Sequence, residues 1–222
     1  MPKPINRRSM LQLGMVGSVG ALGGAMLPTS DPECVTPSQT SGPFYPKRPQ
    51  LDTDIDLTII EGRSDRAEGE VVTISGQVLD DALQPVPGAL VEIWQANTHG
   101  RYHHEDDPNT APEDPAFQGW GKMRADAEGR YGFKTIIPGA YPAANDWWRP
   151  PHIHFKVAKR GYHELVTQMY FAGHELNAPD RILQGIPEDD RERVVVAFAE
   201  SDTEAGVRHG VFTIVLQRVV QG

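Results

Sequence analysis

Two tyrosines and two histidines form the group of side chains with the clearest potential for chemistry. Tyr102 and Tyr141 each follow a glycine by two residues, and His152 and His154 form an HxH pair. Phenolate is a hard, anionic ligand that prefers Fe(III), whereas a neutral imidazole binds many first-row transition metals. Two phenolates would neutralise most of the charge of a ferric ion and make it harder to reduce. The four residues therefore predict a metal site in which an oxidised ion activates a substrate.

Several alternatives to this ligand set stay open when only the residues are considered. His103 and His104 directly follow Tyr102 and are further candidate ligands. The HxH pair could instead join Asp146, or another carboxylate, in the facial triad of Fe(II) oxygenases. An HxH pair can also be an ordinary core or surface pair, and a tyrosine in a Pro-Gly loop usually serves packing. The residues by themselves predict a metal site and leave the identity of the metal open.

The histidine pair requires a strand, because side chains two residues apart point to the same face of a strand. Alternating and β-branched residues predict this strand and four or more others, bounded by turns that contain Gly, Pro or Asp. The predicted strands cover residues 70–78, 89–94, 131–136, 153–158, 165–171 and 211–218. Residues 84–88 and 126–129 are predicted turns, and residues 189–200 fit either a short helix or a strand. This spacing predicts an all-β fold, an antiparallel β-sandwich.

Two long connections with little regular pattern separate the predicted strands. They cover residues 95–121 and 138–151, and each contains one of the two tyrosines. Long loops on a rigid β scaffold usually carry binding or catalysis. We therefore predict that these connections are active-site loops.

Composition limits the possible functions. The chain has 222 residues with 22 Gly, 19 Pro and 39% hydrophobic residues, which suffices for one turn-rich domain with a good core. The formal net charge of -9 argues against nucleic acid as a partner, because binding phosphates requires clustered Lys and Arg. Cys34 is the single cysteine, which excludes an internal disulfide and a multi-thiolate metal site within one chain. We interpret it as a loop thiol without a catalytic role.

The sequence divides into three segments. Residues 1–27 carry three basic side chains and no acid before a Gly- and Ala-rich apolar run, which is typical of an export signal. Residues 6–11, NRRSML, are similar to the signal read by the bacterial twin-arginine export machinery, so we predict a periplasmic or otherwise exported protein. A disordered basic tail is the alternative. Residues 28–69 are predicted to form an extended arm, and residues 70–222 the β-sandwich domain.

Several motifs, in order and at compatible spacing, resemble the intradiol aromatic-ring-cleaving dioxygenases, and most closely their protocatechuate 3,4-dioxygenase branch. The resemblance extends over nearly all of the chain after residue 27. Its motifs are TPSQTSGPFY at 36–45, VEIWQAN at 91–97 leading into GRY at 100–102, TIIPGAYP at 135–142, WRPPHIHF at 148–155 and TQMYF at 167–171.

The resemblance implies a mononuclear, non-haem Fe(III) and a role for each of the four residues. Tyr102 and His152 would be equatorial ligands, and Tyr141 and His154 axial ligands. The substrates would be a catechol, which chelates the iron through both oxygens, and O2. Tyr141 would also act in catalysis, because its phenolate would leave the iron and accept a proton from the catechol. Cleavage between the two hydroxyl groups would give a cis,cis-muconate.

The resemblance also implies residues around the substrate. Arg149 and Gln168 would be catalytic and substrate-binding, since a fixed cation and an amide can stabilise developing negative charge. Ile182 would pack on the aromatic ring, and Gly42 and Pro43 would line the pocket. Each has a simpler interpretation: an ion-pair partner for Arg149, a solvent-facing polar residue for Gln168, a core residue for Ile182 and a turn for Gly42-Pro43.

The chain departs from the family's pattern in three ways. In heteromeric protocatechuate dioxygenases, the segment similar to residues 36–45 belongs to the iron-free subunit, whereas here it shares a chain with the ligands. This favours a self-sufficient polypeptide, with a homo-oligomer as one possible assembly. Ala143 replaces a pocket tryptophan, which leaves more room. Fewer than 70 residues precede the first predicted core strand, so the helical dimerisation region of the catechol and hydroxyquinol branches is absent.

These departures favour protocatechuate or another substituted catechol as the substrate. Two alternatives stay open: an intradiol dioxygenase acting on catechol or hydroxyquinol, and a non-catalytic, exported β-sandwich binding module. The binding module would share the strands and turns but would not require the four ligands, so iron content distinguishes it from the enzyme.

Overall fold

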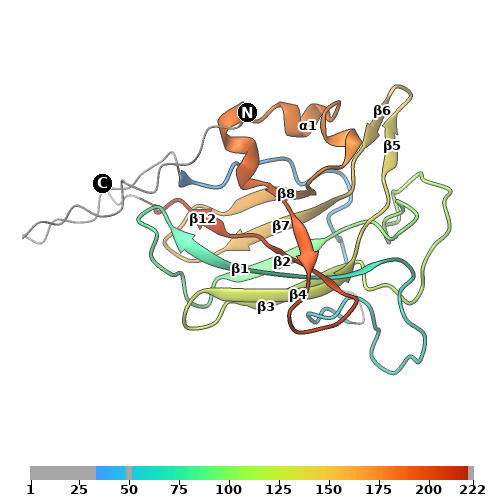
Figure 1. The fold of residues 1–222 in the computed structure, drawn as a ribbon, viewed down its shortest axis with the longest axis horizontal. Helices are drawn as coiled ribbons and strands as arrows, with labels where there is room; N and C mark the ends of the chain where they lie inside the picture. Colours follow the sequence, from blue (N-terminus) through green and yellow to red (C-terminus); the bar gives the residue numbers. More distant parts are fainter. Residues whose placement is uncertain (1–33, 49–51, 220–222) are drawn as a thin grey trace, which may run out of the picture.

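The computed structural model describes residues 34–48 and 52–219, and the predicted export signal at residues 1–27 lies outside them. The described chain folds mainly into strands, which form two five-stranded sheets and one two-stranded hairpin. In Figure 1, strands β1 and β4 of one sheet lie across β2, β7 and β8 of the other. None of the helices within the described ranges is long and apolar enough to span a membrane.

The first sheet is built around β1 (Val71–Asp80). Its other strands are β4 (Arg130–Ile136), β10 (Phe198–Glu200), β11 (Arg208–Val211) and β12 (Ile214–Leu216). β4 runs antiparallel to β1, whereas β11 and β12 run parallel to it. Buried and partly exposed residues alternate at both ends of β1, as expected for a strand with one face on a core.

The second sheet positions the histidine pair. Its central strand is β7 (His152–Ala158), and its strand order is β3-β2-β7-β8-β9. The other strands are β2 (Leu90–Trp94), β3 (Trp120–Arg124), β8 (Leu165–Phe171) and β9 (Val195–Val196). The first four residues of β7 are all buried, so both faces of this strand are covered. Ile153 and Phe155 join the main core, and the alternation of the strand turns the two histidines to the opposite face.

The core lies between the two sheets. Phe155 of β7 packs against Tyr131 of β4, with ring centroids 6.1 Å apart, and against Phe212, at 4.9 Å. These contacts join residues far apart in sequence, so the sandwich is held by packing between sheets as well as by pairing within them. The hydroxyl of Tyr131 donates to the carbonyl of Phe212, at the break between β11 and β12.

The segments outside the two sheets surround one end of β7 and β8. The connection after β4 forms a hairpin of β5 (Tyr141–Ala144) and β6 (Trp147–Arg149), which projects from the sandwich in Figure 1. Three short helices follow β8: two 3₁₀ helices, η3 (Glu175–Asn177) and η4 (Glu188–Arg193), and the α-helix α1 (Arg181–Gln184). Residues 34–48 run along β8 and β12 without regular structure of their own beyond one short turn.

The predicted all-β sandwich is confirmed, with sheets that are mixed rather than wholly antiparallel, because β11 and β12 run parallel to β1 in the first sheet and β9 runs parallel to β8 in the second. The prediction for residues 211–218 was partly wrong, since the pairing with β1 breaks at Phe212 and gives two strands. Residues 189–200 are neither one helix nor one strand, because a 3₁₀ turn leads into β9 and β10. Residues 138–151 are not irregular throughout, since they contain the β5–β6 hairpin.

Candidate metal centre

The four residues singled out in the sequence come together at one end of β7. Their rings form a buried cluster in which exposed fractions range from 2% for the two histidines to 8% for Tyr141. The centroid of the Tyr102 ring is 5.6 Å from that of Tyr141 and 6.2 Å from that of His154. His152 is 5.7 Å from Tyr141 and 4.9 Å from His154. One loop, the start of β5 and the start of β7 therefore bring two phenols and two imidazoles together in one cluster.

His152 is held with the lone pair of its Nε2 facing the cluster. Its Nδ1 lies 2.7 Å from the carbonyl oxygen of Pro150, and because a carbonyl can only accept, Nδ1 carries the proton. Nε2 is therefore unprotonated, and it lies 3.3 Å from the hydroxyl of Tyr102. A carbonyl that fixes the tautomer and ring orientation is the usual support of a metal-binding histidine.

His154 is fixed by stacking rather than by a hydrogen bond. Its ring lies parallel to the indole of Trp94, with centroids 4.7 Å apart and planes at 8°. Its buried Nδ1 has no hydrogen-bond partner within the described part of the chain. Burial, and then the positive charge of Arg149, lowers the pKa of His154 to about 3 and that of His152 well below its ordinary value. Both imidazoles are therefore neutral at physiological pH, which is the form that binds a metal.

The protein alone keeps both phenols protonated. Burial raises the pKa of Tyr102 well above its ordinary value, and the neighbouring Tyr141 raises it further. Burial also raises the pKa of Tyr141, while Arg149 acts in the opposite direction. Ionising either phenol here requires more positive charge than Arg149 supplies, and a multivalent cation at the cluster would supply it. Two buried phenols beside two neutral imidazoles therefore fit a hard, highly charged metal ion.

The structure gives no support to a facial triad. Among residues 34–48 and 52–219, no group of three or more His, Cys, Asp or Glu side chains is placed to hold a metal ion. Asp146 is 78% exposed in the β5–β6 hairpin and pairs with Arg181 at 2.9 Å. His103 is exposed, and the ring of His104 packs against Phe44 instead of the cluster, at 5.7 Å. These three candidates therefore lie outside the ligand set that the structure assembles.

Arg149 and Gln168 lie beside the cluster in a buried polar network. Tyr141 and Arg149 are directly opposite each other in the β5–β6 hairpin. The guanidinium donates to the carboxylate of Asp180 at 2.7 Å and to Gln168 Oε1 at 2.5 Å. The side chains of Arg149 and Asp180 are 4% and 0% exposed. Arg149 therefore does form an ion pair, as its simpler interpretation proposed. The interpretation of Gln168 as a solvent-facing residue was wrong, because Gln168 is fully buried.

The N-terminal arm covers the cluster from the side opposite the core. Gly42 has a φ of +65°, and a Cβ added to it would lie 3.4 Å from Cε1 of His154. The ring of Phe44 packs on Tyr102, with centroids 4.8 Å apart. Pro43 is exposed, and Ile182 is half-buried in α1, outside the hydrophobic clusters of the described residues. One chain thus supplies both the cluster and the arm that closes over it.

Sequence reasoning missed the residues that support the predicted site. Asp180, Tyr170 and Gln39 contact Arg149 or Gln168, and Trp94 stacks on His154. An aspartate before a short apolar stretch is a recognisable helix N-cap signal, and Asp180 does cap α1. The other three contacts form only when separate strands and the arm pack together, so no local pattern marks them.

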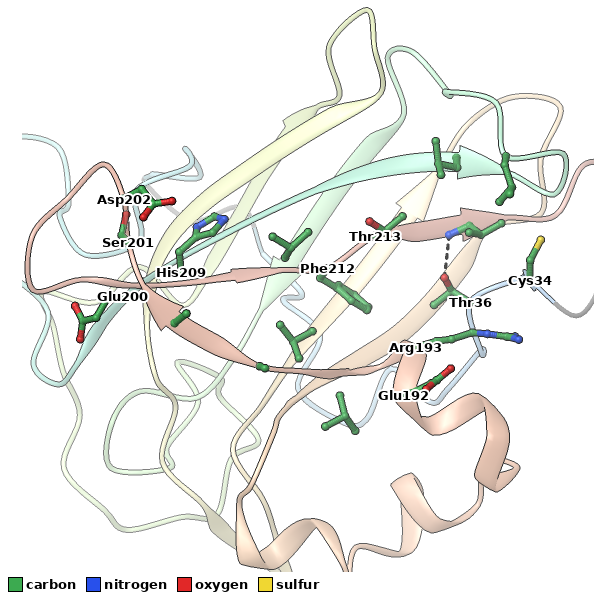
Figure 2. A pocket seen from close by; sticks show the side chains of 18 of the residues that line it. Cys34, Thr36, Glu192, Arg193, Glu200, Ser201, Asp202, His209, Phe212 and Thr213 are labelled. Atoms are coloured by element: carbon green, nitrogen blue, oxygen red, sulfur yellow. Dashed lines mark hydrogen bonds between the residues drawn. The ribbon is translucent and has the colours of Figure 1, made fainter. Parts of the chain in front are cut away.

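A large groove on the described part of the chain lies away from the cluster. It is a groove of about 1190 Å³ between the β9–β10 segment and β11–β12, shown in Figure 2. Its lining includes Cys34, Thr36, His209 and Phe212 and none of the four clustered residues. Among the described residues that line this groove, no three or more His, Cys, Asp or Glu side chains are placed to hold a metal ion. The candidate chemistry is therefore located by the types of side chain in the cluster and not by this groove.

Comparison with known proteins decides the family. The family model described as "Dioxygenase" matches residues 40–218, which include all four clustered residues and both members of the Arg149–Gln168 pair. The chain belongs to the intradiol dioxygenase family. The resemblance seen in the motifs is confirmed, and the protein is an intradiol ring-cleaving dioxygenase of a family that uses non-haem iron.

Three relatives illustrate the range of the family. The dioxygenase is 48% identical over 168 residues to the protocatechuate 3,4-dioxygenase beta chain of Burkholderia cepacia, covering 74% of this chain and 72% of that one. It is 28% identical over 211 residues to the catechol 1,2-dioxygenase of Acinetobacter baylyi, covering 86% of this chain but only 65% of that one. The dioxygenase domain of a dioxygenase and carbohydrate-binding protein fusion from the cellulolytic bacterium Streptomyces sp. SirexAA-E has a similar fold. Its TM-score is 0.62 at 28% identity, and the match covers 83% of this chain and 99% of that one.

Proposed function

We propose that this dioxygenase binds one Fe(III) through Tyr102, Tyr141, His152 and His154. We further propose that it cleaves protocatechuate, or a related substituted catechol, between its two hydroxyl groups with O2 to give a cis,cis-muconate. The observation that carries the proposal is the buried donor set of two phenols and two neutral imidazoles, with no carboxylate among them. The 48% identity to a protocatechuate 3,4-dioxygenase beta chain supports the choice of substrate.

When bound, the iron supplies Lewis-acid activation, which makes the phenolic protons of a catechol removable near neutral pH. The side chains of the protein then hold and move charge around the substrate. Tyr141 is the most exposed of the four and stands opposite Arg149 in the hairpin, which supports a role for its oxygen, once ionised by the metal, in accepting a substrate proton. The lower exposure of Tyr102, 4%, and its contact with the ring of Phe44 support a role as a ligand that would remain on the metal.

Arg149 and Gln168 supply fixed electrostatic stabilisation. Asp180 and Gln168 hold the guanidinium of Arg149 in place, so it needs no rearrangement when negative charge develops on a ring beside the cluster. The side chain of Gln168 is held in turn by the carbonyl oxygen of Thr40, to which its amide donates at 2.8 Å. The nearly complete burial of these groups also excludes water, which strengthens their interaction with the substrate.

The visible absorption spectrum tests the metal and its ligands together. We expect a phenolate-to-iron absorption band in the ferric protein, and a shift of this band when protocatechuate is added under anaerobic conditions. Oxygen uptake with protocatechuate, catechol and hydroxyquinol then ranks the substrates by kcat/KM, and we expect protocatechuate to lead. A protein that stays colourless after ferric loading would refute the iron proposal. A preference for catechol or hydroxyquinol would refute only the choice of substrate.

We also propose that one type of chain is sufficient for activity, since the arm and the cluster belong to the same polypeptide. Activity of the purified recombinant chain, with its mass from light scattering, tests this and reports whether a homo-oligomer forms. Activity that requires a second type of subunit would contradict it.

The basic, twin-arginine-like segment at residues 6–11 supports export of the folded protein. Replacing Arg7 and Arg8 together with lysine should keep the enzyme in the cytoplasm, as measured by cell fractionation. An unchanged distribution would argue against this route.

A further inference from the structure

Gln39 joins the N-terminal arm to the strand that carries Gln168. Its backbone N–H donates to the carbonyl of Val166 at 2.8 Å. Its side-chain amide group donates to Thr167 Oγ1 and to the carbonyl of Gln168, each at 2.9 Å. Its Oε1 accepts a hydrogen bond from the hydroxyl of Tyr170 at 2.8 Å. Every polar atom of the Gln39 side chain is therefore used, and all the partners lie on β8.

Tyr170 extends this connection to Arg149. The Tyr170 hydroxyl is fully buried, 3.3 Å from Gln168 Oε1 and 3.4 Å from a terminal nitrogen of Arg149. A phenol has one proton, and the shorter contact gives that proton to Gln39. The oxygen of Tyr170 is then free to accept from Arg149, and Gln168 Oε1 is left entirely to Arg149. Without the acceptor on Gln39, the Tyr170 proton would turn to Gln168 Oε1 and compete with the guanidinium.

The same residue sets the position of the arm over the cluster. The residue after Gln39, Thr40, accepts a hydrogen bond from the Gln168 side chain through its carbonyl, at 2.8 Å. Two residues further on, Gly42 lies against the ring of His154. A displacement of Gln39 would therefore move both the covering arm and the partners of Arg149.

We propose that Gln39 is a positioning residue for the dioxygenase reaction. It directs the hydroxyl of Tyr170 away from Gln168, and it thereby keeps the guanidinium of Arg149 oriented towards the substrate. This inference rests on the proposed function, because it assigns to Arg149 a role in the reaction. It concerns a residue of the arm whose hydrogen-bond partners all lie on β8 and include none of the four clustered residues.

A simpler role for Gln39 is to anchor the arm, and the chain offers a matched control for that role. Thr36 anchors the same arm to β12: its backbone N–H donates to Val215 O at 3.1 Å, and its hydroxyl accepts from Val215 N at 2.8 Å. Figure 2 shows the second of these bonds at the edge of the groove. Thr36 is 3% exposed, and no contact of its side chain involves Tyr170 or Arg149. Thr36→Val therefore loosens the arm without disturbing the polar network.

The experiment compares iron-loaded wild type with Gln39→Met, Thr36→Val, Tyr170→Phe and the double variant Gln39→Met/Tyr170→Phe. Methionine keeps the length of the side chain and removes its hydrogen bonds. We expect Gln39→Met to lower kcat by about 10- to 100-fold, the range found when the supporting partner of a functional group is lost. We expect Thr36→Val to stay within about twofold of wild type. Amide hydrogen exchange of residues 36–45 in the iron-free proteins should increase in both Gln39→Met and Thr36→Val, which reports loosening of the arm separately from activity.

The double variant separates positioning from anchoring. If Gln39 acts through Tyr170, the loss caused by Gln39→Met should shrink to about twofold or less in the Tyr170→Phe background, because interacting residues are not additive. Gln39→Glu keeps an acceptor for Tyr170, so it should retain more kcat than Gln39→Met. Equal losses of kcat in Gln39→Met and Thr36→Val, or additive losses in the double variant, would overturn the proposal. An inactive, iron-loaded wild type would instead refute the proposed function.

Discussion

The ion pair between Arg149 and Asp180 is fully enclosed, and its removal offers the sharpest test of how this site is held. The two side chains are 4% and 0% exposed, and Asp180 also accepts hydrogen bonds from the backbone N–H groups of Ile182 and Leu183. Removing one partner of a buried pair costs about 3–5 kcal/mol. Losing a side-chain N-cap costs about 1 kcal/mol more. We therefore expect Asp180→Ala to lower the free energy of unfolding by about 4–6 kcal/mol.

The cap and the ion pair can be measured separately. Asn caps a helix as well as Asp does, so Asp180→Asn should be about 1 kcal/mol more stable than Asp180→Ala. Urea unfolding of the iron-free proteins, followed by tryptophan fluorescence, gives both values. The double variant Arg149→Met/Asp180→Leu should recover most of the lost stability, because apolar residues often replace a buried ion pair without cost. A loss below about 1 kcal/mol in Asp180→Ala, or a double variant as unstable as Asp180→Ala, would refute this reasoning.

Three further predictions concern the cluster and its cover. Tyr141→Phe should shift and weaken the phenolate-to-iron absorption of the ferric protein, and an unchanged spectrum would show that Tyr141 is not a ligand. Gly42→Ala and Gly173→Ala both place a side chain at a positive φ, at a cost of about 1–2 kcal/mol in unfolding free energy. Only Gly42→Ala should also raise KM, because only the Cβ added at position 42 contacts His154. Equal KM values in the two variants would contradict the close approach of the arm to His154. In the iron-free protein, the lowered pKa values of His152 and His154 predict full stability above about pH 6.5 and a progressive loss as the pH falls below it, which for His154 continues to about pH 3. The slope should reach about 1.4 kcal/mol per pH unit for each histidine, and urea unfolding between pH 7 and 4 that shows no slope would contradict it.

The pKa values of Tyr102 and Tyr141 depend on two opposing effects, burial and the positive charge of Arg149. Burial raises the pKa of Tyr102 and of Tyr141 above the ordinary value of a phenol, and the charge of Arg149 acts against burial at both. A bound ferric ion would reverse the balance at both phenols, so metal binding should release protons and stabilise the fold. The packing of the protein thus assembles the cluster, and a bound metal ion would determine its protonation.

The sequence by itself determined the chemistry of the candidate site and much of its scaffold. The HxH spacing placed His152 and His154 on one face of a strand, because a strand repeats every two residues, and β7 shows this arrangement. Alternating apolar residues predicted most core strands to within a few residues of their ends. The two tyrosines stood out because phenol oxygen beside imidazole is a rare donor combination, which depends on residue type and not on position.

Only the tertiary structure decided how these residues are supported and enclosed. The bond from Arg149 to Asp180 spans 31 residues, and that from Tyr170 to Gln39 spans 131. Such contacts follow from the docking of α1 and of the arm on the second sheet, and no periodic pattern along the chain encodes them. The same docking buries Gln168, for which the local strand pattern also allowed a position on the solvent-facing side of the strand. Local sequence sets which way a side chain points from its own element, whereas the packing of distant elements sets which groups it meets.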